Sequence, residues 1–392
     1  MTHVITLNAG SATVKFALFA AAPAGPLLRA GGVAEMLAEG GRLRVKAVGA
    51  PPEEVVVWRG GAGFHAEAIA RALRWCAETH PGLRIGAAGH RVVHGGQHYA
   101  APLLVDTAVL EALAALVPLA PLHQPHNLAG IRAVAAAFPE IPQVACFDTA
   151  FHRGHAFVND AFALPRTLYA EGIRRYGFHG LSYEYIAGQL RALAPARAAG
   201  RVVVAHLGNG ASMCALRDGR SVASSMGFTA LDGLPMGTRC GQLDPGVLLY
   251  LLQHKGMTPG ALADLLYKDS GLKGLSGLSG DMRELEAAGT PEAAEAIAYF
   301  IARLRQELGG LVALLDGLDA LVFCGGIGEH AWRVREAALT GLGWLGIELD
   351  AAANRAQAPV ISTPRSAVEV RVIPTDEEAM IARHTLAVLQ RG

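Results

Sequence analysis

The sequence has few charged residues and no surplus of either sign. Lys and Arg together number 34, Asp and Glu also number 34, and the four types make up 17% of the 392 residues. A protein that binds the phosphate backbone of nucleic acid usually has a basic surplus, so the balance argues against a nucleic-acid partner. Hydrophobic residues make up 52% of the chain, which excludes a largely disordered protein. At roughly 100–200 residues per domain, the length indicates two domains and at most three.

The chain also lacks a cysteine framework and a membrane segment. Its five cysteines are scattered without a Cys-x-x-Cys pair, which argues against a disulfide scaffold and a structural zinc site. The N-terminus has no basic stretch followed by an apolar one, and no uncharged apolar run reaches about 18 residues. The most apolar long stretch, residues 103–122, contains Asp106, Glu111 and two prolines. We therefore expect no membrane partner and a cytoplasmic location.

Glycine is present in excess, at 47 of 392 residues against a usual ~7%. Residues 4–7 and 14–19 have the composition of strands on either side of a polar turn. Residues 202–205 and 213–216 repeat this pattern around the turn His206–Ser212. Two strand–turn–strand segments about half a chain apart indicate a duplicated architecture.

Helical and strand patterns alternate along the rest of the chain, which predicts an α/β fold with mixed sheets flanked by helices. The expected helices are 64–79, 108–117, 293–315, 330–341 and 377–390, and further expected strands are 144–147 and 320–324. A boundary near residue 150 gives domains 1–150 and 151–376. The closing helix 377–390 can pack on either domain, and we assign it to the first.

The ends of the predicted strands have residues suited to anions and metal ions. Ligands of open α/β sheets bind beyond the carboxyl ends of the strands. Glycines there let backbone N–H groups approach an anion, and Lys or Arg neutralises it. The residues at these ends are Asn8, Gly10, Ser11, Lys15, 89–91, Asp148, 206–210 and 325–328. Mg²⁺ needs one or two carboxylates, which Asp148 and a Glu of residues 375–378 could supply, so we predict a nucleotide phosphate and a metal ion.

Two common nucleotide-binding patterns are absent from the sequence. A P-loop requires Gly-Lys, and none of the five lysines follows a glycine. The glycines of residues 325–328 have the wrong spacing for a dinucleotide-binding fingerprint. An architecture with strand–turn–strand phosphate loops in both halves is the actin-like ATPase and sugar-kinase fold, a duplicated ribonuclease H-like fold.

Ten segments, in the same order along nearly the whole chain, resemble the acetate and butyrate kinase family. They are residues 8–16, 89–96, 118–127, 147–152, 174–185, 206–212, 225–246, 279–286, 325–336 and 373–382. The resemblance implies a two-domain actin-like ATPase fold and a homodimer. It also implies an enzyme that transfers a phosphoryl group reversibly and directly between ATP or ADP and acetate, with Mg²⁺ or Mn²⁺.

The resemblance further implies roles for individual residues. It places the metal at Asn8 and Glu377, with Glu378 as the alternative because the two are adjacent. It gives catalytic roles to Asp148, Arg91, His179 and Arg239, and substrate contacts to Arg91, Val93, Leu122, His123, Phe178 and Ala230. It gives nucleotide contacts to Ser11, Thr13, Lys15, His206, Leu207, Gly208, Asn209, Gly210, Asp281, Met282, Arg283, Gly325, Gly326, Ile327, Gly328 and Glu329.

Three features modify what the resemblance implies. Acetate is already an anion at neutral pH, so we expect Asp148 to orient metal and substrate and not to act as a general base. The family's Arg-Ser-Gly-Asp is replaced by Arg239-Cys240-Gly241-Gln242, which removes a carboxylate beside the arginine. Ala230 stands at a usual proline position, which predicts a larger pocket and better use of propionate.

Taken singly, these residues have simpler interpretations. Lys15 alone would be a surface lysine, and His90, His94 and His98 are more typical of turns or a core than of a metal site, because Gly95-Gly96 argues against a helix. Three rival functions stay open: a propionate or butyrate kinase on the same scaffold, a sugar kinase, and a non-catalytic actin-like ATP-binding protein. A sugar kinase would need a general base and polar contacts in place of the apolar acyl-pocket residues.

Overall fold

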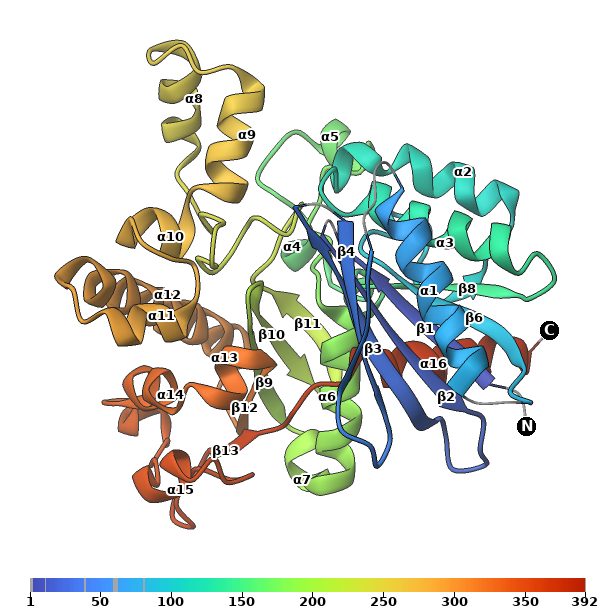
Figure 1. Ribbon diagram of the computed structural model, residues 1–392. Helices are drawn as coiled ribbons and strands as arrows, with labels where there is room; N and C mark the ends of the chain where they lie inside the picture. Colours follow the sequence, from blue (N-terminus) through green and yellow to red (C-terminus); the bar gives the residue numbers. More distant parts are fainter. Residues whose placement is uncertain (1–2, 11, 39, 59–62, 80–81, 392) are drawn as a thin grey trace. The chain divides into compact units, whose positions relative to one another are not determined.

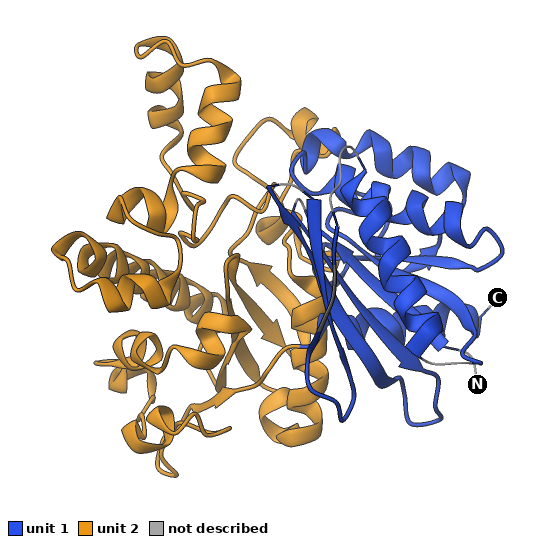
Figure 2. Ribbon diagram, viewed as in Figure 1, with its two compact units in different colours: residues 1–151, 376–392 blue, residues 152–375 orange. Residues whose placement is uncertain are grey.

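The computed structural model describes residues 3–10, 12–38, 40–58, 63–79 and 82–391. They form two compact units (Figure 2). Unit 1 comprises residues 1–151 and 376–392, and unit 2 comprises residues 152–375. In the described part of the chain, no helix is both long and apolar enough to cross a membrane.

Unit 1 is built on one mixed sheet, in which the described strands follow the order β5-β4-β3-β2-β1-β6-β8-β7 (Figure 1). Strands β1 to β5 form an antiparallel series, β6 and β8 continue parallel to β1, and β7 pairs antiparallel with β8. The strands are β1 His3–Ala9, β2 Thr13–Ala20, β3 Leu27–Leu37, β4 Gly40–Ala47, β5 Glu53–Trp58, β6 Ile85–Val92, β7 Leu103–Leu104 and β8 Gln143–Phe147. The helices are α1 Phe64–Thr79, α2 Thr107–Ala115, α3 Gln124–Ala137 and α16 Glu377–Leu389.

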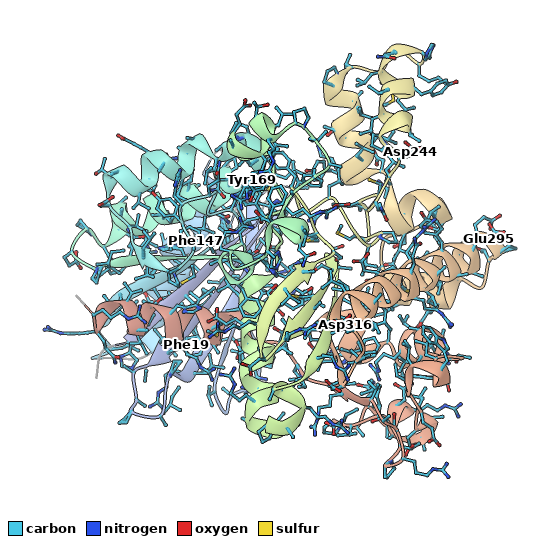
Figure 3. The ribbon with its side chains drawn as sticks, turned by 180° about the vertical axis from the view of Figure 1, so that it is seen from behind. Phe19, Phe147, Tyr169, Asp244, Glu295 and Asp316 are labelled. Atoms are coloured by element: carbon cyan, nitrogen blue, oxygen red, sulfur yellow. The ribbon has the colours of Figure 1, made fainter. Side chains whose placement is uncertain are left out.

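The two faces of this sheet have separate apolar cores. Because side chains alternate along a strand, Phe16 and Leu18 of β2 lie in the larger core with Ile69 of α1. Phe19, on the opposite face of β2, packs with Ala382 of α16 in a smaller core (Figure 3). The closing helix therefore completes the sheet that the first residues of the chain begin.

Unit 2 contains a second mixed sheet, with the described strands in the order β11-β10-β9-β12-β13. Its strands are β9 Arg201–Leu207, β10 Ala211–Arg217, β11 Arg220–Ser224, β12 Ala320–Cys324 and β13 Glu369–Val372. Its helices are α4 Phe157–Asp160, α5 Arg166–Ala170, α6 Gly180–Leu193, α7 Pro195–Ala198, α8 Pro245–Gln253, α9 Pro259–Lys268, α10 Gly271–Ser276, α11 Met282–Ala288, α12 Pro291–Leu315, α13 Gly325–His330, α14 Trp332–Leu339 and α15 Ala351–Arg355.

Local sequence sets the ends of the longest helix, α12. Thr290 precedes it and accepts a hydrogen bond from the backbone N–H of Ala293, and Pro291 occupies its first turn. Both are typical helix-start signals, because they satisfy or remove N–H groups that lack a helical partner. Asp316 ends the helix in the left-handed region, at φ 62° (Figure 3).

The two units repeat one strand arrangement. Strands β3-β2-β1-β6-β8 of unit 1 and β11-β10-β9-β12-β13 of unit 2 have the same order and the same directions. The first three strands of each set are antiparallel, and the last two run parallel to the third. This confirms the duplicated α/β architecture with mixed sheets that the two strand–turn–strand segments predicted.

Two local predictions were wrong. The predicted turn residues Asn8 and His206 lie inside β1 and β9, because the ladder with the following strand continues to Ala9 and Leu207. The glycine-rich segment after β12 is helical from Gly325, and the next helix, α14, is shorter than the predicted 330–341. Gly325 allows the sharp change of direction because it adopts φ 75°, a conformation that other residues rarely reach.

Candidate active site

The centre of the unit 1 site is an ion pair between Arg91 and Asp148. Arg91 lies near the end of β6, and Asp148 directly follows the parallel strand β8, so adjacent strand ends bring them together. Arg91 donates from Nε to Asp148 Oδ1 at 3.0 Å and from Nη2 to Oδ2 at 2.6 Å. A third bond runs from Arg91 Nη1 to Asn8 Oδ1 at 3.1 Å. Paired bonds of this kind fix the guanidinium plane.

Asp148 is buried and Arg91 is partly buried. Burial alone would lower the pKa of Arg91, but the charges of Asp148 and Glu377 outweigh it and raise the pKa. Arg91 therefore stays protonated. Burial raises the pKa of Asp148, while the charge and hydrogen bonds of Arg91 oppose that rise. Each group thus depends on the other to remain charged in the interior.

Further carboxylates surround this pair. Glu377 begins α16, and its Oε2 lies 3.9 Å from Arg91 Nε. Burial and the neighbouring charge of Glu377 raise the pKa of Glu378, and the charge of Lys15 lowers it. Three carboxylates thus gather with one arginine and one lysine, an arrangement that a divalent cation would neutralise.

The donors in unit 1 fit a magnesium-type ion. In the described residues, no three His, Cys, Asp or Glu side chains are arranged to hold a metal by themselves. Mg²⁺ does not need such a cage, since it usually takes one or two carboxylates and completes its shell with phosphate oxygens and water. The amide oxygen of Asn8 and the carboxylates of Glu377 and Asp148 are hard oxygen donors of the type it prefers.

The turn between β1 and β2 is the first predicted phosphate loop. Within it, the N–H of Gly10 donates to the carbonyl of Thr13 at 2.8 Å. Lys15 is exposed on β2 and pairs across the ladder with Asn8. Ser11, a predicted nucleotide contact, lies outside the described residues.

The unit 2 site contains two stacked histidines. The ring of His179 stacks on that of His206, with centroids 4.3 Å apart and planes at 22°. His179 immediately precedes α6 and adopts the left-handed conformation at φ 58°, whereas His206 lies near the end of β9. A residue other than glycine is uncommon in that conformation and often marks a functional site.

Glycines allow the loop after β9 to approach these histidines. A Cβ atom on Gly210 would lie 3.2 Å from His179 Nε2 and 3.7 Å from Arg239 Nη1. A Cβ atom on Gly208 would lie 4.0 Å from His206 Nε2 and 3.9 Å from the backbone nitrogen of Gly326. The structure therefore brings together six of the predicted residues of unit 2.

Arg239 and Glu329 are held by backbone groups of unit 2. Arg239 Nη1 donates to the carbonyl of Ala230 at 3.2 Å. Glu329 Oε1 accepts from the N–H of Gly325 at 2.9 Å and from the N–H of Thr375 at 3.3 Å. One carboxylate oxygen of Glu329 thus bonds two backbone N–H groups. One lies at the start of α13, and the other lies just before the chain returns to unit 1.

The segment Asp281–Arg283 lies at the start of α11. Asp281 caps this helix by accepting from the N–H of Arg283, and the side chains of the two residues also pair. These hydrogen bonds from Arg283 lower the pKa of Asp281 to about 2. The preceding residue, Gly280, contacts the backbone of Gly237, which in turn lies against Asn209.

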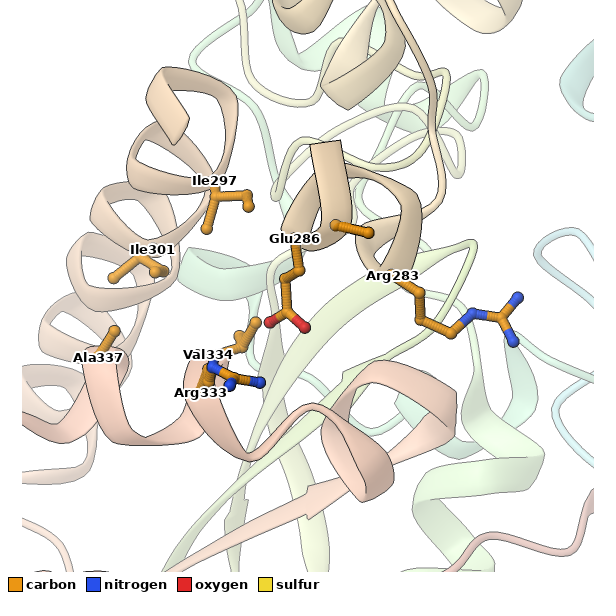
Figure 4. Close-up of a pocket in the computed structure, with 8 residues that line it drawn as sticks. Arg283, Glu286, Ile297, Ile301, Arg333, Val334 and Ala337 are labelled. Atoms are coloured by element: carbon orange, nitrogen blue, oxygen red, sulfur yellow. The ribbon is translucent and has the colours of Figure 1, made fainter. Parts of the chain in front are cut away.

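A cavity of about 590 Å³ opens beside this segment. Ile297 and Ile301 come from α12, Glu286 from α11 and Val334 from α14, as Figure 4 shows. Arg283, Ala287, Arg333 and Ala337 complete the lining. The cavity therefore combines apolar walls with a few charged groups, which is typical of sites for small organic ligands.

The predicted acyl-pocket residues are divided between the two units. In unit 1, Val93 is buried just after β6, and its N–H donates to Asn127 Oδ1 at 2.9 Å. Leu122 and His123 lie half-buried before α3. In unit 2, Phe178 is buried next to His179, and Ala230 is bonded to Arg239.

Several residues of these sites were not singled out by the sequence. The side chain of Asn127 joins β6 to β1, because it also donates to the carbonyl of Ala9 at 2.9 Å. In unit 2, Ser182 and Ser212 form hydrogen bonds with the two stacked histidines. Ser212 lies directly opposite His206 in the β9–β10 ladder. This pairing of β9 with β10 was the one signal that could have pointed to Ser212, because cross-strand partners share a face of the sheet.

Solved structures of known enzymes have the same fold over the whole chain. The propionate kinase of Francisella tularensis is 37% identical, with a TM-score of 0.90 over 99% of this chain and 100% of that one. Porphyromonas gingivalis acetate kinase is 35% identical, with a TM-score of 0.88 over 99% and 100% of the two chains. The actin-like ATPase fold and the charged sites of the two units define a carboxylate kinase.

Sequence comparison makes the assignment more specific. The model of the acetokinase family matches residues 3–383. The acetate kinase of Methylocella silvestris is 63% identical over 99% of this chain and 98% of its own length. The acetate kinase of Rhizobium meliloti is 52% identical over 99% of both chains. The chain belongs to the acetokinase family.

Proposed function

We propose that this protein is an acetate kinase, which transfers the terminal phosphoryl group of ATP to acetate and forms acetyl phosphate reversibly. The fixed Arg91–Asp148 pair carries the proposal, because it presents a cation to a small carboxylate. The 63% identity to an acetate kinase over 99% of the chain supports it.

Arg91 has hydrogen-bond donors to spare for a substrate. A guanidinium carries five N–H groups. Asp148 accepts from Nε and from one N–H of Nη2, and Asn8 accepts from one N–H of Nη1. Two N–H groups, one on each terminal nitrogen, are not used by the described residues. We propose that they bind the acetate carboxylate, whose two oxygens match such a fork.

Asp148 then acts through Arg91. Acetate is ionised at neutral pH and needs no general base to become a nucleophile. Both oxygens of Asp148 accept hydrogen bonds from Arg91, so the carboxylate orients the arginine and preserves its charge. This role agrees with the expectation that Asp148 orients the substrate.

The neighbouring residues His179, Arg239, Gly208 and Gly210 of unit 2 can stabilise the negative charge of a phosphoryl group during its transfer. That group spreads negative charge over three oxygens, and enzymes stabilise it with fixed donors and cations. Arg239 supplies a charge and the stacked His179 supplies a ring N–H. The close approach of Gly208 and Gly210 leaves backbone amides near both. We propose direct in-line transfer on this basis.

We propose that Asn8 and Glu377 hold Mg²⁺ or Mn²⁺, with Asp148 and Glu378 close by. A bound divalent ion neutralises charge on the phosphate oxygens of ATP. The cross-strand position of Lys15 opposite Asn8 supports a role for it as a second cation on the nucleotide side.

The cavity beside Asp281–Arg283 is the proposed site of the adenosine moiety. Its isoleucines and alanines offer an apolar surface to a planar base. A Cβ atom on Gly208 would lie 3.9 Å from the backbone nitrogen of Gly326, and a Cβ atom on Gly326 would meet no protein atom within 4 Å. We propose that the nucleotide uses that open space.

We also propose that two copies of the chain form a homodimer. Unit 2 exposes large apolar side chains on α8, namely Val247, Leu249 and Tyr250. Sedimentation velocity measures the mass directly: about twice 40.9 kDa supports the dimer, and a monomer overturns it. A cytoplasmic location stays a prediction from the sequence.

A hydroxamate-trapped kinase assay tests the function. Purified protein is given Mg-ATP with acetate, propionate or butyrate, and an Arg91→Ala variant of equal thermal stability serves as the control. Acyl phosphate from acetate, lost in the variant, supports the proposal. Faster turnover of propionate would favour a propionate kinase on the same scaffold. No acyl phosphate from any of the three acids would overturn the carboxylate substrate.

A further inference from the structure

Each of the stacked histidines in unit 2 is bonded through Nδ1 to a buried serine. Ser212 Oγ lies 2.8 Å from His179 Nδ1, and Ser182 Oγ lies 2.8 Å from His206 Nδ1. Both serines are fully buried, so solvent does not replace these bonds. Nε2 of each ring is the nitrogen that approaches the glycine loop.

Ser212 has a second partner behind it. Its Oγ lies 2.5 Å from the hydroxyl of Tyr183, which is also fully buried. Within the described part of the chain, the Tyr183 hydroxyl contacts no other hydrogen-bonding atom. Burial raises the pKa of Tyr183 well above its usual range, so the phenol keeps its hydrogen. That hydrogen needs an acceptor, and Ser212 Oγ is the one available.

Counting hydrogens leaves one arrangement in which every buried donor is satisfied. If Tyr183 donates to Ser212, the hydroxyl hydrogen of Ser212 must go to His179, and Nδ1 must be unprotonated to accept it. If Nδ1 instead carried a hydrogen and donated it to Ser212, either the serine or the tyrosine hydroxyl would be left unpaired. An unpaired buried donor costs about 1–3 kcal/mol, or roughly 5- to 150-fold in population.

We propose that Ser212 acts as a hydroxyl relay that fixes His179 as the neutral tautomer with its proton on Nε2. Ser212 is the positioning residue, because its hydroxyl bonds Nδ1, and Tyr183 is only its hydrogen-bond partner. The inference deepens the proposed function, because it states how the histidine meets the phosphoryl group: as a neutral hydrogen-bond donor. The positive charge at that point then comes from Arg239, which lies on the same side of Gly210.

The second histidine repeats the arrangement. Ser182 Oγ lies 2.7 Å from Thr375 Oγ1 as well as 2.8 Å from His206 Nδ1. If Thr375 donates to Ser182, the hydrogen of Ser182 likewise goes to an unprotonated Nδ1 of His206. Two rings stacked at 4.3 Å would repel each other if both were imidazolium ions. Neutral tautomers remove that repulsion and direct two N–H groups to the loop.

Nitrogen-15 NMR of protein labelled at histidine tests the relay without any need for activity. A protonated and an unprotonated ring nitrogen have well-separated shifts, and a His179→Gln variant assigns the signal. At neutral pH we expect His179 in the wild type to have an unprotonated Nδ1 and a protonated Nε2. A protonated Nδ1, whether in the other tautomer or in an imidazolium ion, would overturn the proposal.

Three variants separate the relay from general loosening of the core. Ser212→Ala removes the donor to Nδ1, so the ring should populate both tautomers, and Ser212→Thr should restore the single one. Tyr183→Phe breaks a bond of the same network but leaves the Ser212 hydrogen directed to Nδ1, so the tautomer should stay unchanged. A single Nε2–H tautomer in Ser212→Ala would show that the relay does not set it.

Kinetics of the same variants report on the catalytic consequence. We expect Ser212→Ala to lower kcat about tenfold with KM for ATP changed less than about threefold, because the donor is lost in the transition state and not in nucleotide binding. Tyr183→Phe and Ser212→Thr should stay within about threefold of the wild type. If the wild type makes no acyl phosphate, the proposed function fails, whereas the tautomer measurement still decides the relay.

Discussion

Asp148 supplies the negative charge that balances the partly buried Arg91, and it fixes the orientation of the guanidinium. The Asp148 side chain is 2% exposed and that of Arg91 is 19% exposed, so little water reaches the pair. Asp148→Asn removes the negative charge and leaves Arg91 with a neutral partner. We expect kcat/KM for acetate to fall by about 10- to 100-fold, since a hydrogen bond to a charged group that orients Arg91 is worth about 1.5–3 kcal/mol. Steady-state kinetics with acetate varied at saturating Mg-ATP measures this loss.

An exposed ion pair in unit 2 provides the matched control. Glu348 accepts from Arg365 at 2.7 Å, but both side chains face water, with 44% and 84% exposed. Glu348→Gln should leave the kinetics and the Tm unchanged, because water screens the pair. An Asp148→Asn variant as active as Glu348→Gln would contradict the role given to Asp148.

Ala230 supports a second prediction at this scale, on acyl-chain preference. Its carbonyl accepts from Arg239, while its N–H makes no hydrogen bond to the described residues, so Ala230→Pro breaks none. The larger side chain should narrow the pocket. We expect the ratio of kcat/KM for propionate to that for acetate to fall about tenfold or more, as one methylene is worth about 1–3 kcal/mol. An unchanged ratio in competition assays would show that Ala230 does not set chain length.

The sequence predicted the charged and catalytic-type residues of the site, but it did not predict the residues that only position them. Arg91, Asp148 and His179 stand in segments that resemble a known family, so they were predicted. Tyr183 and Ser212 lie 29 residues apart, and a serine or tyrosine alone predicts nothing. Only the register of the sheet and the start of α6 bring the two hydroxyls together.

Among the elements, α16 joins the fold to the site, because it covers one face of the unit 1 sheet and begins at Glu377. It can lie close to β6 because position 89 is glycine. A Cβ atom there would lie 2.7 Å from Ile381 Cγ2 and would also strike Thr385. The position of Glu377 at the start of α16 therefore depends on the close packing of this helix against Gly89.

Gly89→Ala should push α16 away from the sheet. We expect a loss of about 1–3 kcal/mol in the free energy of unfolding, as for other overpacked cores. KM for Mg-ATP should rise as well, because Glu377 moves with the helix. Urea unfolding and titration with magnesium measure the two effects.

Gly188 in α6 supplies the control for this change. It is an exposed helical glycine, and a Cβ atom on it would meet nothing within 4 Å. Gly188→Ala should stabilise the protein by about 0.5–1 kcal/mol through helix propensity alone. If Gly89→Ala were equally harmless, the close packing of α16 on β6 would not limit the site.

The periodicity of the sequence predicted which segments are helices and which are strands, but it did not always predict where each element ends. Phe64–Thr79 and Ala320–Cys324 have the predicted bounds, because turn residues or glycines flank a regular pattern. Residues 325–329 were predicted as a loop from their glycines. They are helical because the carboxylate of Glu329 returns to accept the N–H of Gly325, a contact that composition does not reveal.

At the scale of the whole molecule, the chain leaves unit 1 after Phe151 and returns to it at Asp376. The duplicated strand order was foreseeable from the two strand–turn–strand segments. The side on which the closing helix packs was not, since its apolar face would suit either sheet. Ala382 packs with Phe19 and Ala17 on this face of β2, and that contact decides the side.

Acid should destabilise the molecule within a defined pH range. Burial lowers the pKa of His90 in unit 1 to about 4 and that of His152 in unit 2 to about 3, against ~6.5 in an unfolded chain. Between these values the unfolded state binds more protons than the folded state, so the free energy of unfolding rises with pH. The stabilisation is complete above about pH 6.5 and is lost as the pH falls toward 4.

Thermal unfolding at steps from pH 7.5 to 4.5 tests this expectation. Tm should be nearly constant down to pH 6.5 and then fall steadily, with each fully buried histidine contributing up to about 3 kcal/mol. The raised pKa values of Glu307 and Glu378 act in the opposite direction, because burial favours their protonated forms in the folded state. His152→Gln should start from a lower Tm at pH 7.5 but show a shallower fall. A Tm that rises on acidification, or a variant as acid-sensitive as the wild type, would mean that the carboxylates and not the histidines govern acid stability.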